Sequence, residues 1–272
     1  MEIKYIDIHS HFNLSPLKEK KEEVIAQMIE KGVATIVIGV DYETSKEAIQ
    51  LAERYDFIWA GVGLHPTDND KEIFDFKKYA ELAKHQKVVC IGECGLDYFR
   101  NQREETKQKQ KETFQKQVEL AVSLKKPLMI HARPSKGSMD AYEDALDILV
   151  HYPALKGTPP QQGWETLRAN FHFFVGNIEI SKRALDMGFT MSFDGPITFS
   201  RDYDEVIKFL PIDSIMCETD APFAAPAPHR GKTCEPWMVE EVYKKISEIK
   251  EMDFEEARLT INKNVKRFFN IN

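Results

Sequence analysis

Six residues that could bind a divalent metal ion are spread along the sequence, and each lies at or near the end of a short apolar run. Neutral imidazoles and carboxylates suit Zn²⁺ and Mn²⁺, and carboxylates with water also hold Mg²⁺. The set is larger than one ion with an open position needs, so we predict two divalent ions (Mg²⁺, Mn²⁺ or Zn²⁺). The predicted metal ligands are His9, His11, Glu93, His131, His172 and Asp220.

Bound ions would permit hydrolysis at neutral pH, because they lower the pKa of a bound water to about 7 in favourable cases. We expect one ion on the His9–His11 pair and Asp220, and the second on the two later histidines, with Glu93 as the bridge. Asp220 is also expected to accept the proton of the attacking water. Asp220 and Glu93 are therefore the candidate catalytic residues. The competing interpretation is a set of hydrogen-bonded structural histidines, but their recurrence at strand ends favours a metal site.

Three further residues are candidates for binding an anionic substrate. Arg133 follows His131 by two residues, and Arg230 lies in the loop after the last predicted strand. A planar guanidinium can donate two hydrogen bonds to one phosphate. His65, at the end of the third predicted strand, could donate to a phosphate or a leaving group. The alternative for Arg133 is a structural ion pair with one of the many acidic residues.

Aromatic residues also occur near the predicted strand ends, where they could stack unpaired bases. Most aromatic side chains in such positions only close a hydrophobic core, so base stacking is the less favoured of two hypotheses. The residues concerned are Phe12, Tyr98, Phe99, Phe174 and Phe223.

The elements that must position these residues alternate along the whole chain. The predicted strands are 5–9, 34–39, 57–63, 87–92, 128–131, 170–174, 189–193 and 214–218. The predicted helices are 17–31, 43–55, 71–84, 103–125, 139–150, 177–187, 202–209, 236–250 and 253–269. Strands that are apolar on both faces suit a parallel sheet covered by helices. An open sheet usually has a glycine-rich loop after its first strand, and no such loop follows the first strand here.

Eight such units predict an α/β fold, a single-domain (β/α)8 TIM barrel over residues 1–272. The carboxyl ends of all strands in such a barrel open into one mouth, so ligands that are distant in sequence converge there. The segment 151–170 is rich in turn-forming residues and is expected to be an excursion between the fifth helix and the sixth strand.

Composition restricts the remaining possibilities. The 272 residues include 37 Lys and Arg against 44 Asp and Glu, a net charge of −7, which disfavours a protein that coats nucleic acid through a broad basic face. No apolar run approaches a membrane span, and the amino terminus does not resemble a secretion signal. Four cysteines are too few for a disulfide scaffold. We expect a cytoplasmic protein with no obligate protein partner.

A series of ordered motifs resembles the TatD family of metal-dependent hydrolases. They are Asp7-Ile-His-Ser-His11, Gly63-Leu-His-Pro66, Ile91-Gly-Glu-Cys-Gly-Leu-Asp-Tyr98, Ile130-His-Ala-Arg133, Phe171-His-Phe-Phe-Val-Gly176, Glu218-Thr-Asp-Ala-Pro222 and Arg230-Gly-Lys232. The resemblance implies a barrel of the metal-dependent amidohydrolase type and a metal-dependent deoxyribonuclease, commonly an exonuclease. It also implies the same six metal ligands, with DNA, single-stranded or at strand ends, as the substrate.

The sequence departs from the family pattern at several positions near the predicted mouth. Val175 stands where serine or threonine is usual, Cys234 replaces an asparagine, and Asp194 replaces a small neutral residue. The segment 157–164 is longer than typical. These departures affect the substrate more than the metals, so two alternatives remain. One is hydrolysis of an amide, a lactone or an aminoacyl-tRNA ester on the same barrel, and the other is a non-catalytic binding protein.

Overall fold

The computed structural model describes residues 1–100, 102–152 and 167–271. Within them, eight parallel strands pair in chain order. They are β1 (Tyr5–Ser10), β2 (Val33–Ile38), β3 (Ile58–Val62), β4 (Val88–Asp97), β5 (Leu128–Arg133), β6 (Ala169–Phe171), β7 (Thr190–Phe193) and β8 (Ile215–Cys217). The predicted insertion at 157–164, and most of the predicted excursion, lie outside the described residues.

The first and last strands meet at their carboxyl ends and nearly close the sheet into a barrel. Ser10 forms a parallel bridge with Ala221. The Asp220 amide donates to the carbonyl of His9 at 2.9 Å, and the His11 amide donates to the carbonyl of Ala221 at 2.6 Å. This seam confirms the predicted TIM barrel, and it ties two predicted ligand segments directly together.

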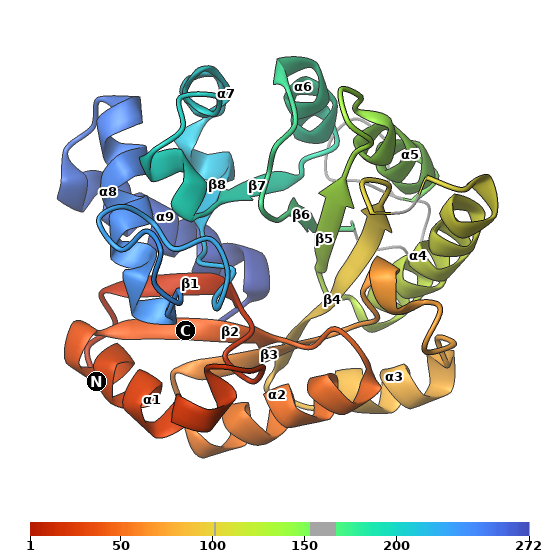
Figure 1. The fold of residues 1–272 in the computed structure, drawn as a ribbon, viewed down its shortest axis with the longest axis horizontal. Helices are drawn as coiled ribbons and strands as arrows, with labels where there is room; N and C mark the ends of the chain where they lie inside the picture. Colours follow the sequence, from red (N-terminus) through yellow and green to blue (C-terminus); the bar gives the residue numbers. More distant parts are fainter. Residues whose placement is uncertain (101, 153–166, 272) are drawn as a thin grey trace.

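The helices surround the strands (Figure 1). They are α1 (Lys21–Lys31), α2 (Tyr42–Arg54), α3 (Phe76–Ala83), α4 (Glu104–Leu124), α5 (Asp140–Leu149), α6 (Ile178–Asp186), α7 (Asp204–Phe209), α8 (Val239–Lys250) and α9 (Phe254–Phe269). Several begin with a side chain that accepts from free amides of the first turn, as Asp41 does for α2 and Asn177 for α6. No helix of the described ranges is long and apolar enough to cross a membrane.

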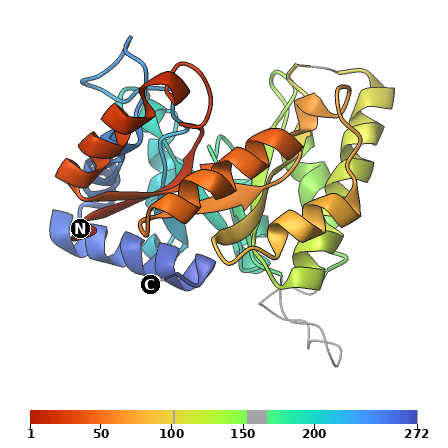
Figure 2. The ribbon, with the colours of Figure 1, turned by 90° about the horizontal axis from the view of Figure 1, so that it is seen from below.

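Alternate residues of the strands face either the outer helices or the inside of the barrel. Ile6 and Ile8 of β1 belong to an inner cluster that also contains Val265 and Phe268 of α9. The last helix therefore packs against the amino-terminal end of the barrel, and the two chain termini lie near each other on that side (Figures 1 and 2). The opposite end, at the carboxyl termini of the strands, is left for the site.

Most strand boundaries shift by one or two residues from the prediction, and the two larger differences both concern ligands. The predicted strand 87–92 ends before Glu93, whereas β4 continues to Asp97. Its register against β5 shifts between Ile91 and Cys94, which places Glu93 in a bulge that the alternating pattern does not reveal. The predicted strand 170–174 is too long, because β6 ends at Phe171 and His172 follows it directly.

Glycine at position 95 allows β4 to approach β5 closely, since a Cβ there would lie 2.0 Å from the carbonyl oxygen of His131 and the φ angle is +136°. We expect Gly95→Ala to lower the free energy of unfolding by about 3 kcal/mol or more, the range of severe core substitutions. Gly137→Ala is the matched control, because Gly137 has a φ of +77° but nothing near its Cβ position. It should cost only about 1 kcal/mol. Urea unfolding of the two variants measures the difference, and equal midpoints would contradict the steric argument.

Candidate metal centre

The six predicted metal ligands converge at the carboxyl end of the barrel. His9 lies in β1, Glu93 in β4 and His131 in β5, and the other three lie in the segments that follow β1, β6 and β8. All six are largely buried, so few waters compete for their polar atoms. The six side chains belong to five strands or to the segments directly after them. Closure of the sheet brings the ends of these strands together.

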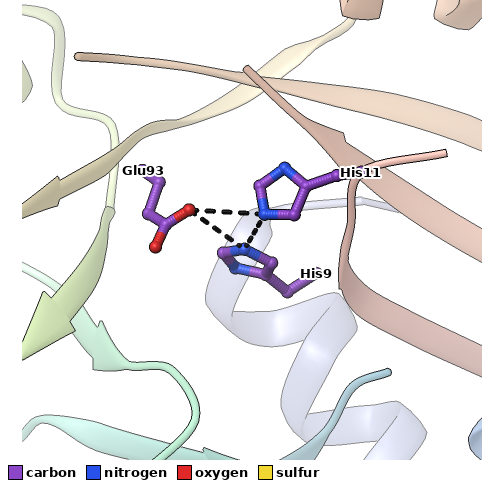
Figure 3. A group of neighbouring side chains, drawn as sticks. All are labelled: His9, His11 and Glu93. Atoms are coloured by element: carbon purple, nitrogen blue, oxygen red, sulfur yellow. Dashed lines mark hydrogen bonds and ion pairs between the residues drawn. The ribbon is translucent and has the colours of Figure 1, made fainter. Parts of the chain in front are cut away.

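Glu93 occupies the middle of the cluster, with each carboxylate oxygen facing a different pair of histidines. Its Oε2 lies 3.3 Å from Nε2 of His11 and 3.5 Å from Nε2 of His9 (Figure 3). Its Oε1 lies 2.8 Å from Nδ1 of His131 and 2.8 Å from Nε2 of His172. A carboxylate with one oxygen toward each of two imidazole pairs has the arrangement of a bridging ligand.

The half of the cluster around His9 and His11 has the dimensions of a coordination sphere. Their Nε2 atoms are 3.0 Å apart, and Oδ1 of Asp220 lies 3.7 Å and 3.5 Å from them. Ligand atoms about 2.1 Å from one ion would be separated by about 3.0–3.4 Å, so the two imidazole nitrogens fit such a sphere and the Asp220 oxygen lies slightly farther out. Nδ1 of His11 lies 3.0 Å from the carbonyl oxygen of Ile38. Donation to that oxygen leaves the lone pair of Nε2 directed into the cluster.

His65 joins the other half of the cluster, although the sequence predicted it only as a substrate-binding residue. Its Nε2 lies 3.3 Å from Oε1 of Glu93. The Thr67 amide donates to Nδ1 of His65, so the ring proton belongs on Nε2. His65 therefore presents a hydrogen-bond donor to the centre rather than a lone pair.

The charges of the cluster follow from burial and close contact. Burial raises the pKa of the Glu93 carboxyl, but the nearby imidazoles, foremost His65 and His172, outweigh it and hold that pKa well below its usual range. Burial lowers the pKa of His11, yet its contacts with Asp220 and Glu93 raise it to about 10. The carboxylates are thus ionised, and cations, whether protons or metal ions, are favoured beside them.

Two acidic residues that sequence reasoning missed hold the second pair of histidines. Oδ2 of Asp97 lies 3.2 Å from Nε2 of His131. Oε1 of Glu218 lies 3.5 Å from Nδ1 of His172, and its Oε2 accepts from the Ser192 hydroxyl at 2.6 Å. In each of the two histidines, one ring nitrogen faces its acid and the other ring nitrogen faces Glu93. Both acids lie within the quoted motifs, Asp97 four residues after Glu93 and Glu218 two residues before Asp220.

A third acidic residue, Asp7, fixes the segment that carries Asp220. The Thr219 hydroxyl donates to Oδ2 of Asp7 at 2.7 Å, and the Thr219 amide donates to Oδ1 at 2.9 Å. Asp220 itself has a φ of +53°, an uncommon conformation for a residue with a side chain. These bonds hold the segment after β8 in the one path that turns the Asp220 carboxylate toward His9 and His11.

The two predicted substrate arginines lie outside this cluster. Arg133 ends β5, and its guanidinium carbon lies 4.2 Å from the ring centroid of Phe99. Arg230 lies in the segment after β8, with its guanidinium carbon 4.0 Å from the ring centroid of Phe199. Their binding of substrate stays a prediction.

The three single-residue departures from the family pattern occupy different environments. Val175 is partly exposed, whereas Cys234 is buried, with its thiol 3.7 Å from the carbonyl oxygen of Thr219. Asp194 is buried, and burial together with the nearby Glu218 raises the pKa of its carboxyl well above the usual range.

Removing the charge of Asp97 should weaken binding of the ion nearest His131. In Asp97→Asn the amide no longer fixes the tautomer of that ring, and such supporting partners typically contribute 10- to 100-fold in metal affinity. We expect a loss of about that size at one ion, measured by calorimetric titration of the metal-free protein with Mn²⁺. Asp144→Asn, which removes a carboxylate charge that accepts from the buried Tyr98 but lies outside the cluster, is the control. Equal affinity in Asp97→Asn and the native protein would contradict the role of Asp97.

A parallel (β/α)8 barrel with histidines and carboxylates at the carboxyl ends of its strands defines a class, the barrel hydrolases that depend on metal ions. Residues 6–270 match the family model of TatD related DNases, and the chain belongs to that family. The resemblance predicted from the motifs is thus confirmed, and at this level the protein is a metal-dependent hydrolase.

Individual relatives agree with this assignment. The uncharacterized metal-dependent hydrolase YabD of Bacillus subtilis is 39% identical over 270 residues, covering 98% of this chain and 99% of its own. An uncharacterized metal-dependent hydrolase of Mycoplasma genitalium is 32% identical over 281 residues, with 98% and 99% covered. Among solved structures, YjjV, a TatD homolog from Escherichia coli, shares the fold with a TM-score of 0.86 at 24% identity, with 100% of both chains covered.

Proposed function

We propose that this protein hydrolyses phosphodiester bonds of DNA, as an exonuclease acting on single strands or strand ends, with two divalent ions at the centre around Glu93. The observation that carries the proposal is the Glu93 carboxylate, which directs one oxygen toward each of two histidine pairs. Membership of the family of TatD related DNases supports DNA as the substrate. We place the enzyme in the cytoplasm, in keeping with four buried cysteines that are all free thiols.

Divalent ions, when bound, would supply a water of lowered pKa and neutralise charge on the phosphoryl oxygens. The residues of the chain then divide the remaining tasks. His9, His11 and Asp220 would hold one ion and His131 and His172 the other, with Glu93 shared between the two groups. Asp220 accepts the proton of the attacking water, because its carboxylate is ionised and lies at the edge of the cluster. His65 donates from Nε2 to the phosphate or to the leaving oxygen.

The proposal is tested by offering competing substrates to protein of known metal content. The purified protein, loaded in turn with Mg²⁺, Mn²⁺ or Zn²⁺, is incubated with a single-stranded oligodeoxynucleotide labelled at one end, with and without a chelator. Stepwise release of nucleotides that the chelator abolishes is the expected result. Cleavage of an amide, a lactone or an aminoacyl-tRNA ester without cleavage of DNA would instead establish carbonyl chemistry on the same centre. Stable binding of DNA without turnover of any substrate would indicate a binding protein.

A further inference from the structure

Two arginine–phenylalanine pairs lie beyond the carboxyl ends of the strands. In each pair the guanidinium lies over the ring, at 4.2 Å for Arg133 on Phe99 and 4.0 Å for Arg230 on Phe199. Nearly half of each ring side chain is still exposed, 48% for Phe99 and 42% for Phe199. Within the described ranges, neither arginine forms an ion pair with a carboxylate. Each pair therefore combines a cation that has no carboxylate partner among the described residues with a ring that is still partly exposed.

A third exposed ring, Phe223, lies beside the metal ligands themselves. It is 55% exposed, and its ring centroid is 6.4 Å from that of His11. The other aromatic residues near strand ends behave differently, because Phe12, Tyr98 and Phe174 are buried in the core. Of the aromatic residues that the sequence singled out, only Phe99 and Phe223 are thus exposed, and the other three belong to the core. The structure adds Phe199 as a further exposed ring.

The exposed rings occupy two separate parts of the barrel rim. Phe99 follows β4 and Arg133 ends β5, and the Tyr98 amide donates to the Arg133 carbonyl at 2.8 Å. Phe199 and Arg230 lie in the segments after β7 and β8, which are joined by a bond from the Ala227 amide to the Thr198 hydroxyl at 2.8 Å. The first part adjoins His131, and Phe223 on the second part adjoins His11. A strand of substrate that contacts both parts therefore passes beside a metal ligand at each.

We infer that these rings and arginines form a stacking rim for unpaired nucleotides, which holds a single strand on both sides of the phosphate to be cleaved. The inference rests on the proposed function and names the residues that select its substrate. Aromatic rings stack on any base, and a guanidinium adds a cation–π contact or a phosphate contact. A paired base within a duplex already has a neighbour on each face, so stacking on the rim selects unpaired bases. The rim is made of isolated pairs, which agrees with a protein of net charge −7 that lacks a broad basic face.

The test compares strands with and without bases, by binding rather than by cleavage. Protein loaded with Mg²⁺ is titrated into two fluorescent single strands with hydrolysis-resistant phosphorothioate linkages, an oligothymidylate and an abasic strand of equal length. Stacking contributes about 1–3 kcal/mol per base, or about 5- to 150-fold in affinity. We expect the native protein to prefer the strand with bases by at least this factor.

Variants then assign the preference to the rim. Phe223→Leu keeps an apolar side chain without a ring, and it should reduce the preference by about 5-fold or more, whereas Phe223→Trp should preserve it. Phe99→Leu should act in the same direction. Phe209→Leu is the matched control, because Phe209 is also an exposed ring beneath a cation, Lys182, but ends α7 at the opposite end of the barrel. It should bind as the native protein does.

The outcomes separate this inference from the proposed function. Equal binding of the two strands by the native protein, or an unchanged preference in both Phe223→Leu and Phe99→Leu, would overturn the stacking rim even if DNA is cleaved. An intact preference that depends on Phe223 would support the rim even if no phosphodiester bond is hydrolysed, and in that case the proposed catalysis alone fails.

Discussion

Replacing Glu93 with alanine should lower kcat/KM for phosphodiester hydrolysis by about a thousandfold or more and leave the protein unable to hold two ions at once. Glu93 contacts both histidine pairs through its carboxylate, at 3.3 Å from His11 on one side and 2.8 Å from His172 on the other. Its loss removes the shared negative charge and leaves four buried imidazoles without a common acceptor. Metal ions supply several kcal/mol of transition-state stabilisation, and each 1.36 kcal/mol is about tenfold in rate.

Elemental analysis of metal content and steady-state kinetics on a single-stranded oligodeoxynucleotide measure the two effects together. Glu93→Gln separates charge from volume, because it fills the same space but offers only one acceptor oxygen. Glu72→Gln is the control, since Glu72 also accepts a hydrogen bond, from Tyr79 at 2.9 Å, but lies outside the cluster. Normal metal content and turnover in Glu93→Ala would refute the assignment of Glu93 as the bridge.

Replacing Asp220 with asparagine should lower kcat by about 10²- to 10⁴-fold, the usual contribution of a general base, while KM changes only a few-fold. Asp220 is the carboxylate of the centre nearest to solvent, with 12% of its side chain exposed against 4% for Glu93. A proton taken from the attacking water can therefore leave through Asp220 and not through Glu93. The two are thus suited to different tasks, transfer of a proton and fixation of the ions.

The matched control for this variant is Asp194→Asn. Asp194 is buried at the same end of the barrel, and burial with the neighbouring Glu218 raises the pKa of its carboxyl, which favours the uncharged form that an asparagine resembles. We expect its turnover to remain within a few-fold of the native value. Stopped assays over a range of substrate concentrations give kcat and KM for both variants. A loss in Asp220→Asn that appears only in KM would assign Asp220 to substrate binding instead of proton transfer.

The sequence predicted the barrel and the convergence of its ligands because both depend on simple periodicity. Apolar strands alternating with amphipathic helices require a layered parallel fold, and such a fold collects whatever follows each strand at one end. The pairing of His9 with His11 was likewise predictable from their spacing of two. These features depend on repeating patterns, which a single sequence displays.

The local distortions of the strands could not be predicted in the same way. The register shift in β4 places Glu93 at the centre, yet nothing in the alternation of apolar residues marks a bulge at Gly92 and Glu93. The supporting acids were missed for a related reason. Asp97 lies in β4 beyond residue 92, where the sequence predicts that the strand has ended. The role of Glu218 depends on its contacts with the segment after β6 and with β7.

The position of α9 determines where a surface or a fusion partner can be attached to the protein. Both chain ends emerge beside α9, at the end of the barrel remote from the mouth (Figures 1 and 2). A bead, a surface or a fusion partner joined to either end would thus face away from incoming polymer. Under the proposed function, immobilised protein should process long strands as readily as protein free in solution, and single-molecule recording from either terminus can test this.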